Sequence, residues 1–451
     1  MNPQIFREYD IRGRVDEDLT PEVVESLGRG YAAMMIKEKG IPAPKIALGR
    51  DCRLSSDRLR DNLVKGLTAS GCHIIDIGVC PTPMLYFALF NLEVDGGLMI
   101  TGSHNPPEFN GFKVCVGKET IYGPLIQHLR EIIEEGNFVD GNGDAEILPI
   151  TDKYVTYLKE NIKLARPLKV ILDAGNGTGG VIAAPVMEAL GCDVTCLFCD
   201  MDGHFPNHHP DPTIPENMRF LIEKVTGGNA DLGIGYDGDA DRIGVVDDKG
   251  NIIWGDQLMI LFSRAILSEH PGATIVSEVK CSMNLYEDIK KNGGKGIMWK
   301  AGHSLIKKKM REEKALLGGE MSGHIFFADR YFGYDDAIYA SLRLLEMLSR
   351  DTRTVSEMLA DVPKTYSTPE LRVECPDEKK FDVVAAVKDY FVKNGYDLVD
   401  VDGVRVIFND GWGLVRPSNT QPVIVLRFEA TTEARLNEIR GLIEGKLKEY
   451  L

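Results

Sequence analysis

The sequence predicts an α/β protein with four domains: three similar mixed α/β domains with mostly parallel sheets, and a smaller C-terminal α+β domain. The chain has 451 residues, too many for one hydrophobic core. Short apolar runs alternate with helical patterns along most of it, which is typical of parallel strands joined by helices. After Tyr366 several strands follow one another without this alternation, which indicates an α+β domain. We expect the domains at residues 1–150, 151–252, 253–365 and 366–451.

Each expected strand is an apolar run that ends at glycine or polar residues, and each expected helix carries apolar residues at helical spacing. The strands of the first domain are residues 45–49, 73–78 and 97–101. Those of the second are residues 168–172, 193–198, 231–234 and 244–247, and those of the third are residues 274–279, 296–299 and 315–318. Helices are expected at residues 151–165, 181–190, 282–291 and 304–313. The last domain should contain strands at residues 371–373 and between residues 398 and 428, and helices at residues 378–393 and 432–448.

The composition excludes several classes of protein. A formal net charge of −16 argues against a general nucleic-acid or anionic-membrane surface, because bound phosphates require clustered Lys and Arg. No apolar run reaches the ~18 residues that span a bilayer. Residues 1–14 are charged and lack the apolar core of a signal peptide. We therefore expect a cytoplasmic protein, a monomer or weak homo-oligomer, that binds neither nucleic acid nor membranes.

Cysteines and glycines offer two weaker signals. The nine cysteines are scattered and odd in number, so they do not form a disulfide framework and fit a reducing compartment. Cys196 and Cys199 form a CxxC pair without further Cys or His nearby to complete a zinc site, and we interpret both as buried structural thiols. The glycine-rich turn at residues 173–180 does not match the known phosphate-binding patterns, so tight packing is the favoured explanation for its glycines.

The loop after the expected strand 97–101 presents Ser103, followed by His104. Pro106 and Pro107 fix two φ angles, so this loop cannot relax into a helix. Ligands bind at the carboxyl ends of strands in open α/β sheets, which makes Ser103 a candidate nucleophile or phosphate carrier with an imidazole beside it. Taken alone, these residues fit a polar β-turn equally well.

A second loop, DGDADR, places Asp237, Asp239 and Asp241 at alternate positions after an expected strand. Such a loop can direct three carboxylates at one hard cation, and oxygen ligands suit Mg²⁺. One alternative is a solvated acidic turn. Another is an aspartyl-phosphate nucleophile at Asp237, as in haloacid-dehalogenase-type phosphatases, but those have Thr or Val after the second Asp, where this chain has Ala240.

Two further loops carry groups that bind sugars and phosphates. The sequence GGEMSGH presents Glu320 and Ser322, which can bond adjacent sugar hydroxyls, and His324, which titrates near neutral pH. The sequence VRPSNTQP presents a guanidinium, hydroxyls, an amide and backbone donors, a set that suits a phosphate dianion. These residues are Arg416, Ser418, Asn419 and Thr420. Either loop alone could be a polar surface turn.

Together the four loops resemble the α-D-phosphohexomutase superfamily over essentially the whole chain. TGSHNP with the downstream Lys113, DGDADR, GEMSGH and R-x-SNT-x-P occur in the order and spacing of that family. FREYDIRG, GRDCRLSS and KAGHSLIK are similar to its bacterial phosphomannomutase/phosphoglucomutase branch. Ala301 and Pro417 depart from the family pattern, and neither carries chemistry.

The resemblance implies a mutase that interconverts hexose 1-phosphates and hexose 6-phosphates of mannose, glucose or both. Ser103 would carry the phosphoryl group as phosphoserine and form a hexose bisphosphate, with Mg²⁺ and glucose 1,6-bisphosphate or mannose 1,6-bisphosphate as cofactor and activator. The implied catalytic residues are Ser103, His104, Lys113, Arg242 and His324, and the implied metal ligands are Ser103, Asp237, Asp239 and Asp241. The implied substrate-binding residues are Tyr9, Arg12, Lys280, His303, Glu320, Ser322, Arg416, Ser418, Asn419 and Thr420. We expect the four domains to surround a central cleft.

Three alternatives remain open at this point. A phosphoglucosamine mutase is the nearest, although Met321 favours the mannose/glucose branch because the amino-sugar branch usually has Gln there. A magnesium-dependent sugar-phosphate phosphatase would release inorganic phosphate. A non-catalytic sugar-phosphate-binding protein is disfavoured, because every motif residue expected for chemistry is present.

Overall fold

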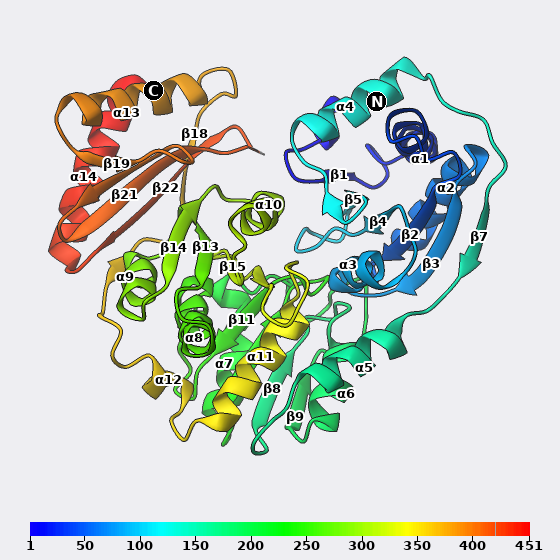
Figure 1. Cartoon of the computed structure of the whole chain (residues 1–451). Helices are drawn as coiled ribbons and strands as arrows, with labels where there is room; N and C mark the ends of the chain where they lie inside the picture. The colour runs from blue at the N-terminus through cyan, green and yellow to red at the C-terminus, as the bar shows by residue number, and fades with distance from the viewer. Residues whose placement is uncertain (420) are drawn as a thin grey trace. The chain divides into compact units, whose positions relative to one another are not determined.

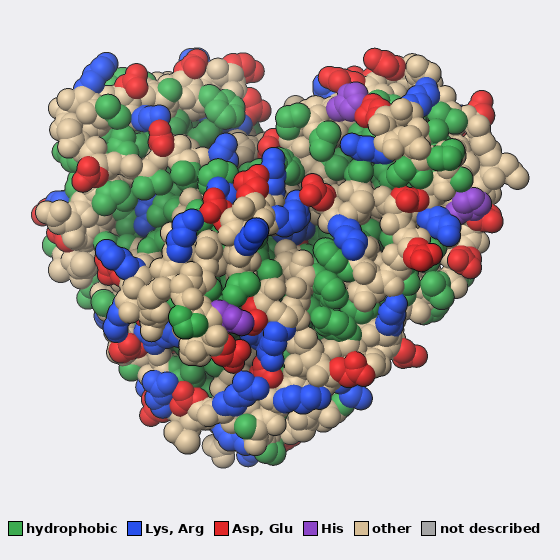
Figure 2. Space-filling model, in the orientation of Figure 1, with side chains coloured by type: hydrophobic (Ala, Val, Ile, Leu, Met, Phe, Trp, Pro, Cys, Tyr) green, Lys and Arg blue, Asp and Glu red, His purple; other side chains and the backbone are tan. Residues whose placement is uncertain are grey.

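The computed structural model describes residues 1–419 and 421–451, and the chain forms two compact units. Unit 1 comprises Met1–Gly255 and Ser322–Met358, and unit 2 comprises Asp256–Met321 and Leu359–Leu451. Among the described residues, no helix is both long and apolar enough to cross a membrane. Acidic and basic side chains are interspersed over the face of the protein that Figure 2 shows.

Unit 1 begins with a mixed sheet. Its strands are β1 (Ile11–Arg14), β2 (Lys45–Arg50), β3 (His73–Val79), β4 (Gly96–Ile100), β5 (Phe109–Val116), β6 (Glu119–Thr120) and β7 (Asp144–Ile147), in the order β1-β5-β4-β2-β3-β7 with β6 beside β5. The strands β4, β2, β3 and β7 are parallel, whereas β5 runs antiparallel to β4 and β1 antiparallel to β5. The helices of this region are α1 (Pro21–Ala33), α2 (Ser56–Ala69), α3 (Thr82–Asn91) and α4 (Pro124–Glu135).

Local sequence explains several of these elements. All five residues of β4, GGLMI, are buried, as expected for a central strand with both faces covered. Helix α4 begins with Pro124 and is followed by Gly136, whose φ of 65° lies in the left-handed region that ends a helix. The sheet therefore places the end of β4, and the loop that follows it, at a fixed point in unit 1.

The second sheet of unit 1 has the order β12-β11-β10-β8-β9. Its strands are β8 (Lys169–Asp173), β9 (Asp193–Leu197), β10 (Leu232–Tyr236), β11 (Ile243–Val246) and β12 (Ile252–Ile253). Strand β8 is parallel to β9 and β10, while β10 and β11 form an antiparallel pair. Other elements of unit 1 are α5 (Thr151–Asn161), α6 (Gly180–Ala189), α7 (Arg219–Thr226), β16 (Ile325–Phe327), α11 (Ala337–Arg350) and α12 (Val355–Met358).

Unit 2 contains a parallel and an antiparallel arrangement of strands. Strand β13 (Thr274–Glu278) pairs in parallel with β14 (Lys295–Trp299) and β15 (Leu317–Gly319). The helices near these strands are α8 (Gly255–Glu269), α9 (Met283–Lys291) and α10 (His303–Glu313). The antiparallel sheet comprises β17 (Tyr366–Ser367), β18 (Leu371–Glu374), β19 (Asp397–Val399), β20 (Val404–Phe408), β21 (Gly411–Pro417) and β22 (Val423–Ala430).

Helices α13 (Lys380–Lys393) and α14 (Glu433–Tyr450) pack against this last sheet, as Figure 1 shows. Their buried apolar residues, among them Phe391 and Ile443, form one core with Phe428 of β22. The predicted fold class is therefore confirmed: mixed α/β sheets, mostly parallel, are followed by a C-terminal α+β region.

The interpretation of the CxxC pair is wrong in one respect. All nine cysteines are free, but Cys196 is exposed and Cys199 is only half-buried. The reason is that β9 lies at the edge of its sheet, where one side of the strand has no neighbour. The local run of apolar residues around Cys196 does not reveal this position.

Candidate active site

Ser103 lies three residues after the end of β4 and is almost completely buried. Its hydroxyl donates a hydrogen bond to Asp237 Oδ2 at 2.8 Å and lies 3.1 Å from Nδ1 of His104. Burial lowers the pKa of His104 well below its ordinary value, and the positive charges of Arg242 and Arg12 lower it further. His104 is therefore neutral, and its Nδ1 can exchange a proton with the Ser103 hydroxyl.

The three aspartates lie on the loop between β10 and β11. Asp237, Asp239 and Asp241 are fully buried, and each offers a carboxylate oxygen within 4.8 Å of the other two. Burial, followed by repulsion from Asp241 and Asp239, raises the pKa of Asp237 well above its ordinary value. Burial and the charge of Asp241 also raise the pKa of Asp239. The loop thus concentrates negative charge that a buried environment disfavours.

The donor set of this loop fits a hard divalent cation. Oδ2 of Asp239 accepts hydrogen bonds from the hydroxyls of Thr82 at 2.5 Å and Thr101 at 3.0 Å. Its buried Oδ1 has no hydrogen-bond partner among residues 1–419 and 421–451. A buried carboxylate oxygen without a partner is costly unless a cation binds it, and oxygen ligands suit Mg²⁺. The residues that would hold the ion are Asp237, Asp239, Asp241 and Ser103.

Lys113, on β5, is buried beside these carboxylates, with Nζ 3.1 Å from Asp241 Oδ2. Although burial opposes the effect, the positive charge of Lys113, with contributions from the neighbouring His324 and Arg242, holds the pKa of Asp241 well below its ordinary value. Burial likewise opposes ionisation of Lys113, but Asp241 and Asp239 raise its pKa. Lys113 is therefore protonated at neutral pH and serves as a fixed positive charge rather than as a base.

His324 lies where two partners compete for one nitrogen. Its Nε2 is 3.2 Å from Asp241 Oδ1 and 3.3 Å from Arg242 Nε. A protonated Nε2 donates to Asp241, whereas an unprotonated Nε2 accepts from Arg242, so both states of the imidazole have a partner. The hydroxyl of Ser322 lies 3.2 Å from the other ring nitrogen, Nδ1.

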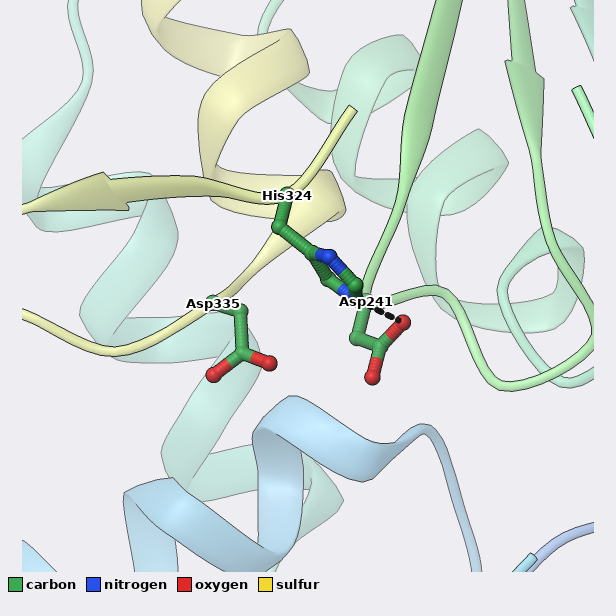
Figure 3. A group of neighbouring side chains, drawn as sticks. All are labelled: Asp241, His324 and Asp335. Carbon is green, nitrogen blue, oxygen red and sulfur yellow. Dashed lines mark ion pairs between the residues drawn. The ribbon is translucent and has the colours of Figure 1, made fainter. Parts of the chain in front are cut away.

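Asp335 joins this group, as Figure 3 shows. Asp241, His324 and Asp335 each offer an atom within 4.8 Å of the other two, and all three are buried. No separate sequence signal marks Asp335, because it precedes Asp336, whose carboxylate caps α11, and an acidic pair before a helix already fits a cap.

Two other predicted residues of unit 1 lie near its N-terminus. Arg12, on β1, donates from Nη1 to Asn105 Oδ1 at 2.8 Å and from Nε to Asp10 Oδ2 at 2.8 Å. It therefore contacts the loop that carries Ser103. Tyr9 is half-buried and precedes β1.

In unit 2, Glu320 and His303 lie at the start of α10. Oε1 of Glu320 accepts a hydrogen bond from the backbone N–H of Gly302 at 2.6 Å, and His303, the first residue of the helix, is buried. One oxygen of Asp402 accepts from Arg416 Nε at 3.0 Å and from the backbone of residue 301 at 3.1 Å. Asp402 thus connects Arg416 to the segment that precedes α10.

The remaining predicted residues of unit 2 lie close to the same strands. Nζ of Lys280 is 3.2 Å from Glu370 and 3.4 Å from Glu278, and the charge of Lys280 lowers the pKa of Glu370 to about 2. The Ser418 hydroxyl accepts a hydrogen bond from the backbone N–H of residue 421 at 3.2 Å, and Asn419 follows it. Thr420 lies outside the described residues.

The structure therefore gathers most of the predicted chemical residues of unit 1 around the aspartates, and it adds residues that carried no motif. Glu278, Glu370 and Asp402 are single acids outside the four loops, and only their contacts with predicted residues identify them as neighbours of those residues.

The glycine-rich turn also has a packing role: the backbone N–H of Thr178 donates to the carbonyl of Gly238 at 3.0 Å, and a Cβ at Gly177 would lie 2.6 Å from that oxygen. This turn supports the aspartate loop, which agrees with the packing explanation for its glycines.

Comparisons with known proteins cover the whole chain. Four family models, described as phosphoglucomutase/phosphomannomutase alpha/beta/alpha domains I, II and III and C-terminal domain, match residues 3–140, 152–250, 254–366 and 370–445. The phosphomannomutase/phosphoglucomutase of Pseudomonas aeruginosa strain PAO1 is 48% identical over 444 residues, which is 98% of this chain and 95% of that protein. The phosphoglucomutase of Neisseria meningitidis serogroup A is 46% identical over 450 residues, covering 98% and 96%.

A solved structure gives the same result for the fold. The crystal structure of a phosphoglucomutase/phosphomannomutase family protein from Burkholderia thailandensis superposes with a TM-score of 0.94 at 42% identity, over 100% of this chain and 98% of that one.

Proposed function

The chain belongs to the phosphoglucomutase/phosphomannomutase family of enzymes, and we propose that it interconverts hexose 1-phosphates and hexose 6-phosphates of mannose and glucose through a phosphoserine at Ser103. The observation that carries this proposal is the hydrogen bond of the buried Ser103 hydroxyl to Asp237, beside two further carboxylates. A hydroxyl in this position can carry a phosphoryl group next to a bound cation.

In the proposed reaction, a hydroxyl of the hexose monophosphate attacks the phosphorus of phospho-Ser103. The bond from phosphorus to the sugar oxygen forms, and the bond from phosphorus to Ser103 Oγ breaks. His324 takes the proton of the attacking hydroxyl. This role is supported by its Nε2, which has a hydrogen-bond partner in either protonation state: Arg242 when unprotonated and Asp241 when protonated. Ser103 Oγ leaves as an alkoxide, which a bound cation would stabilise and to which Nδ1 of the neutral His104, 3.1 Å away, can donate a hydrogen bond.

Charge stabilisation is the main requirement of phosphoryl transfer. The Mg²⁺ ion, when bound, supplies positive charge at the transferred phosphoryl group. Lys113 and Arg242 add fixed positive charges next to Asp241. The bisphosphorylated sugar then returns its other phosphate to Ser103, and activator such as glucose 1,6-bisphosphate or mannose 1,6-bisphosphate would restore enzyme that has lost its phosphate.

We assign the remaining predicted residues to substrate binding. Glu320 and Ser322 would bond sugar hydroxyls, and Arg416, Ser418, Asn419 and Thr420 would hold the phosphate that does not react. Arg416 supports this assignment, because its guanidinium is buried and hydrogen-bonded to Asp402, which fixes its position for binding a phosphate. Tyr9, Arg12, Lys280 and His303 are assigned to the same substrate.

A coupled assay tests the proposal. It would contain Mg²⁺ and catalytic glucose 1,6-bisphosphate, with mannose 1-phosphate, glucose 1-phosphate or glucosamine 1-phosphate as substrate. We expect conversion of the first two to their 6-phosphates, lost in Ser103→Ala and retained in Ser268→Ala, which changes an exposed serine of α8. Preference for glucosamine 1-phosphate would favour the amino-sugar alternative. Release of inorganic phosphate without isomerisation, or activity in Ser103→Ala, would contradict the proposal.

A further inference from the structure

Arg53, just before α2, is completely buried beneath the loop that carries Ser103. Its Nη1 and Nη2 atoms donate to three backbone carbonyl oxygens of that loop, those of Ser103 at 2.8 Å, Asn105 at 2.6 Å and Pro106 at 2.7 Å, and to that of Phe109 at 3.0 Å, the first residue of β5. Its Nε donates to Asp51 Oδ2 at 3.2 Å. A guanidinium has five N–H donors. Every donor of Arg53 therefore has an acceptor, and four of the five bonds hold the loop and the first residue of the strand that follows it.

Asp51 fixes Arg53 and the start of the same loop together. Oδ2 of Asp51 accepts from Arg53 and from the backbone N–H of Gly102 at 3.0 Å, and Oδ1 accepts from the Ser56 hydroxyl at 2.5 Å. A Cβ at Gly102 would lie 2.4 Å from Cζ of Arg53. Only glycine allows the loop to pass this close to the guanidinium.

These contacts maintain the backbone conformation of Ser103. Its φ is 48°, a left-handed conformation that a serine adopts rarely and that surrounding contacts must maintain. Its N–H donates to the hydroxyl of Thr101 at 2.8 Å, and its carbonyl accepts from Arg53. With both backbone groups held, the direction of the side chain is set, and Oγ points at Asp237.

We propose that Arg53 is a positioning residue for phosphoryl transfer, which acts through the backbone of the Ser103 loop and does not contact the sugar. This inference rests on the proposed role of Ser103 as the phosphoryl carrier. By fixing the loop, Arg53 also directs phospho-Ser103 toward the sugar and limits its hydrolysis. In that side reaction a water oxygen bonds to phosphorus, the bond to Ser103 Oγ breaks, Oγ is protonated and orthophosphate leaves.

Arg53→Lys is the main test variant. A lysine keeps the positive charge, but its single nitrogen has three donors and cannot reach four separated carbonyls. We expect kcat to fall by about 10²-fold, the loss associated with a misplacement of about 1 Å. KM should stay within about twofold, because substrate contacts are unchanged. Gly102→Ala is a second variant, which displaces the guanidinium without removing it and should lower kcat in the same way.

Arg50→Lys is the matched control. Arg50 lies three residues before Arg53 and bonds Asp57 at 2.6 Å and Asp76 at 3.2 Å, in the same region of unit 1. The same chemical change at this position should leave kcat and KM as in the unchanged protein. Thermal unfolding of every variant would show which of them remain folded at the assay temperature.

The lifetime of the phosphoserine is a readout that general damage to the fold would not change selectively. Protein phosphorylated with glucose 1,6-bisphosphate would be freed of the sugar and followed by intact mass. We expect phospho-Ser103 to lose its phosphate faster in Arg53→Lys than in Arg50→Lys.

Unchanged kcat and lifetime in both folded test variants would overturn the inference, as would a raised KM with unchanged kcat. A chain without mutase activity, or one whose activity survives Ser103→Ala, would instead refute the proposed function.

Discussion

At the scale of single residues, the balance of buried charges determines the stability of the candidate site. Lys113 is buried within 3.1 Å of Asp241, next to two carboxylates whose pKa values are raised. Removal of one member of a buried ion pair is strongly destabilising, because the other charge stays buried. Lys113 is therefore expected to stabilise the fold around the aspartates through its charge.

Lys113→Met tests this balance. We expect the free energy of unfolding without Mg²⁺ to fall by about 3–5 kcal/mol, because Asp241 loses a positive partner. Added Mg²⁺ should raise the melting temperature more in the variant than in the unchanged protein, since it supplies the missing charge. Thermal unfolding with EDTA or with Mg²⁺ measures both effects.

Lys118→Met is the control, because Lys118 follows the same strand but is exposed. Its melting temperature should be unchanged. If Lys113→Met melted like the unchanged protein in EDTA, the charge of Lys113 would not stabilise the aspartate loop.

At the scale of elements, the cap of α11 is a pH-sensitive feature. Asp336 accepts hydrogen bonds from the backbone of Tyr339 at 2.7 Å and from the hydroxyls of Tyr154 at 2.8 Å and Tyr331 at 2.7 Å. Burial nevertheless raises its pKa to about 6. Because the folded-state pKa is above the ordinary value of about 4, the stabilising contribution of this carboxyl is complete below pH about 4 and is lost as the pH rises through about 6.

Asp336→Asn should remove this pH dependence while it keeps a capping side chain. Between pH 4 and pH 7, we expect the stability of the variant relative to the unchanged protein to increase by about 2 kcal/mol. Unfolding across this pH range measures the difference. Asp351→Asn is the control at the other end of α11: the Asp351 pKa is lowered to about 2, so its effect should be constant above pH 4. Parallel pH curves for Asp336→Asn and the unchanged protein would contradict the prediction.

The elements also show what the sequence could and could not predict. Buried apolar runs followed by polar loops are local signals, so most strands and the four loops were found within a few residues. The pairing of β1 with β5 joins segments about 100 residues apart, and no local pattern specifies such a contact. For the same reason Lys113 could be named only from the family resemblance, and Arg53, Asp335 and Asp402 were missed as site residues. Their importance lies in contacts with distant backbone and side chains.

At the scale of the whole molecule, the chain has separate hydrophobic cores. The core between α13, α14 and the antiparallel sheet includes Ile443, which is fully buried, and it is distinct from the core of the N-terminal sheet. Separate cores predict that unfolding occurs in more than one step.

Ile443→Ala tests this prediction. Loss of a buried isoleucine side chain should destabilise the C-terminal region by about 2–5 kcal/mol. Differential scanning calorimetry should show one transition moved to lower temperature while another stays in place. Val392→Ala, at an exposed position of α13, should move neither. A single transition that shifts as a whole would show that the two cores unfold together.

Because of the hydrogen bonds of Arg53, two separate segments of the sequence, and not the serine loop alone, define this part of the structure. Arg53 and Ser103 stand 50 positions apart in the chain, yet the carbonyl oxygens of the second segment accept their hydrogen bonds from the arginine of the first. An engineer who transplanted TGSHNP alone into another scaffold would leave its carbonyl oxygens without the arginine that binds them. A database search that pairs TGSHNP with an upstream Asp-x-Arg should therefore find functional relatives more selectively than either segment alone.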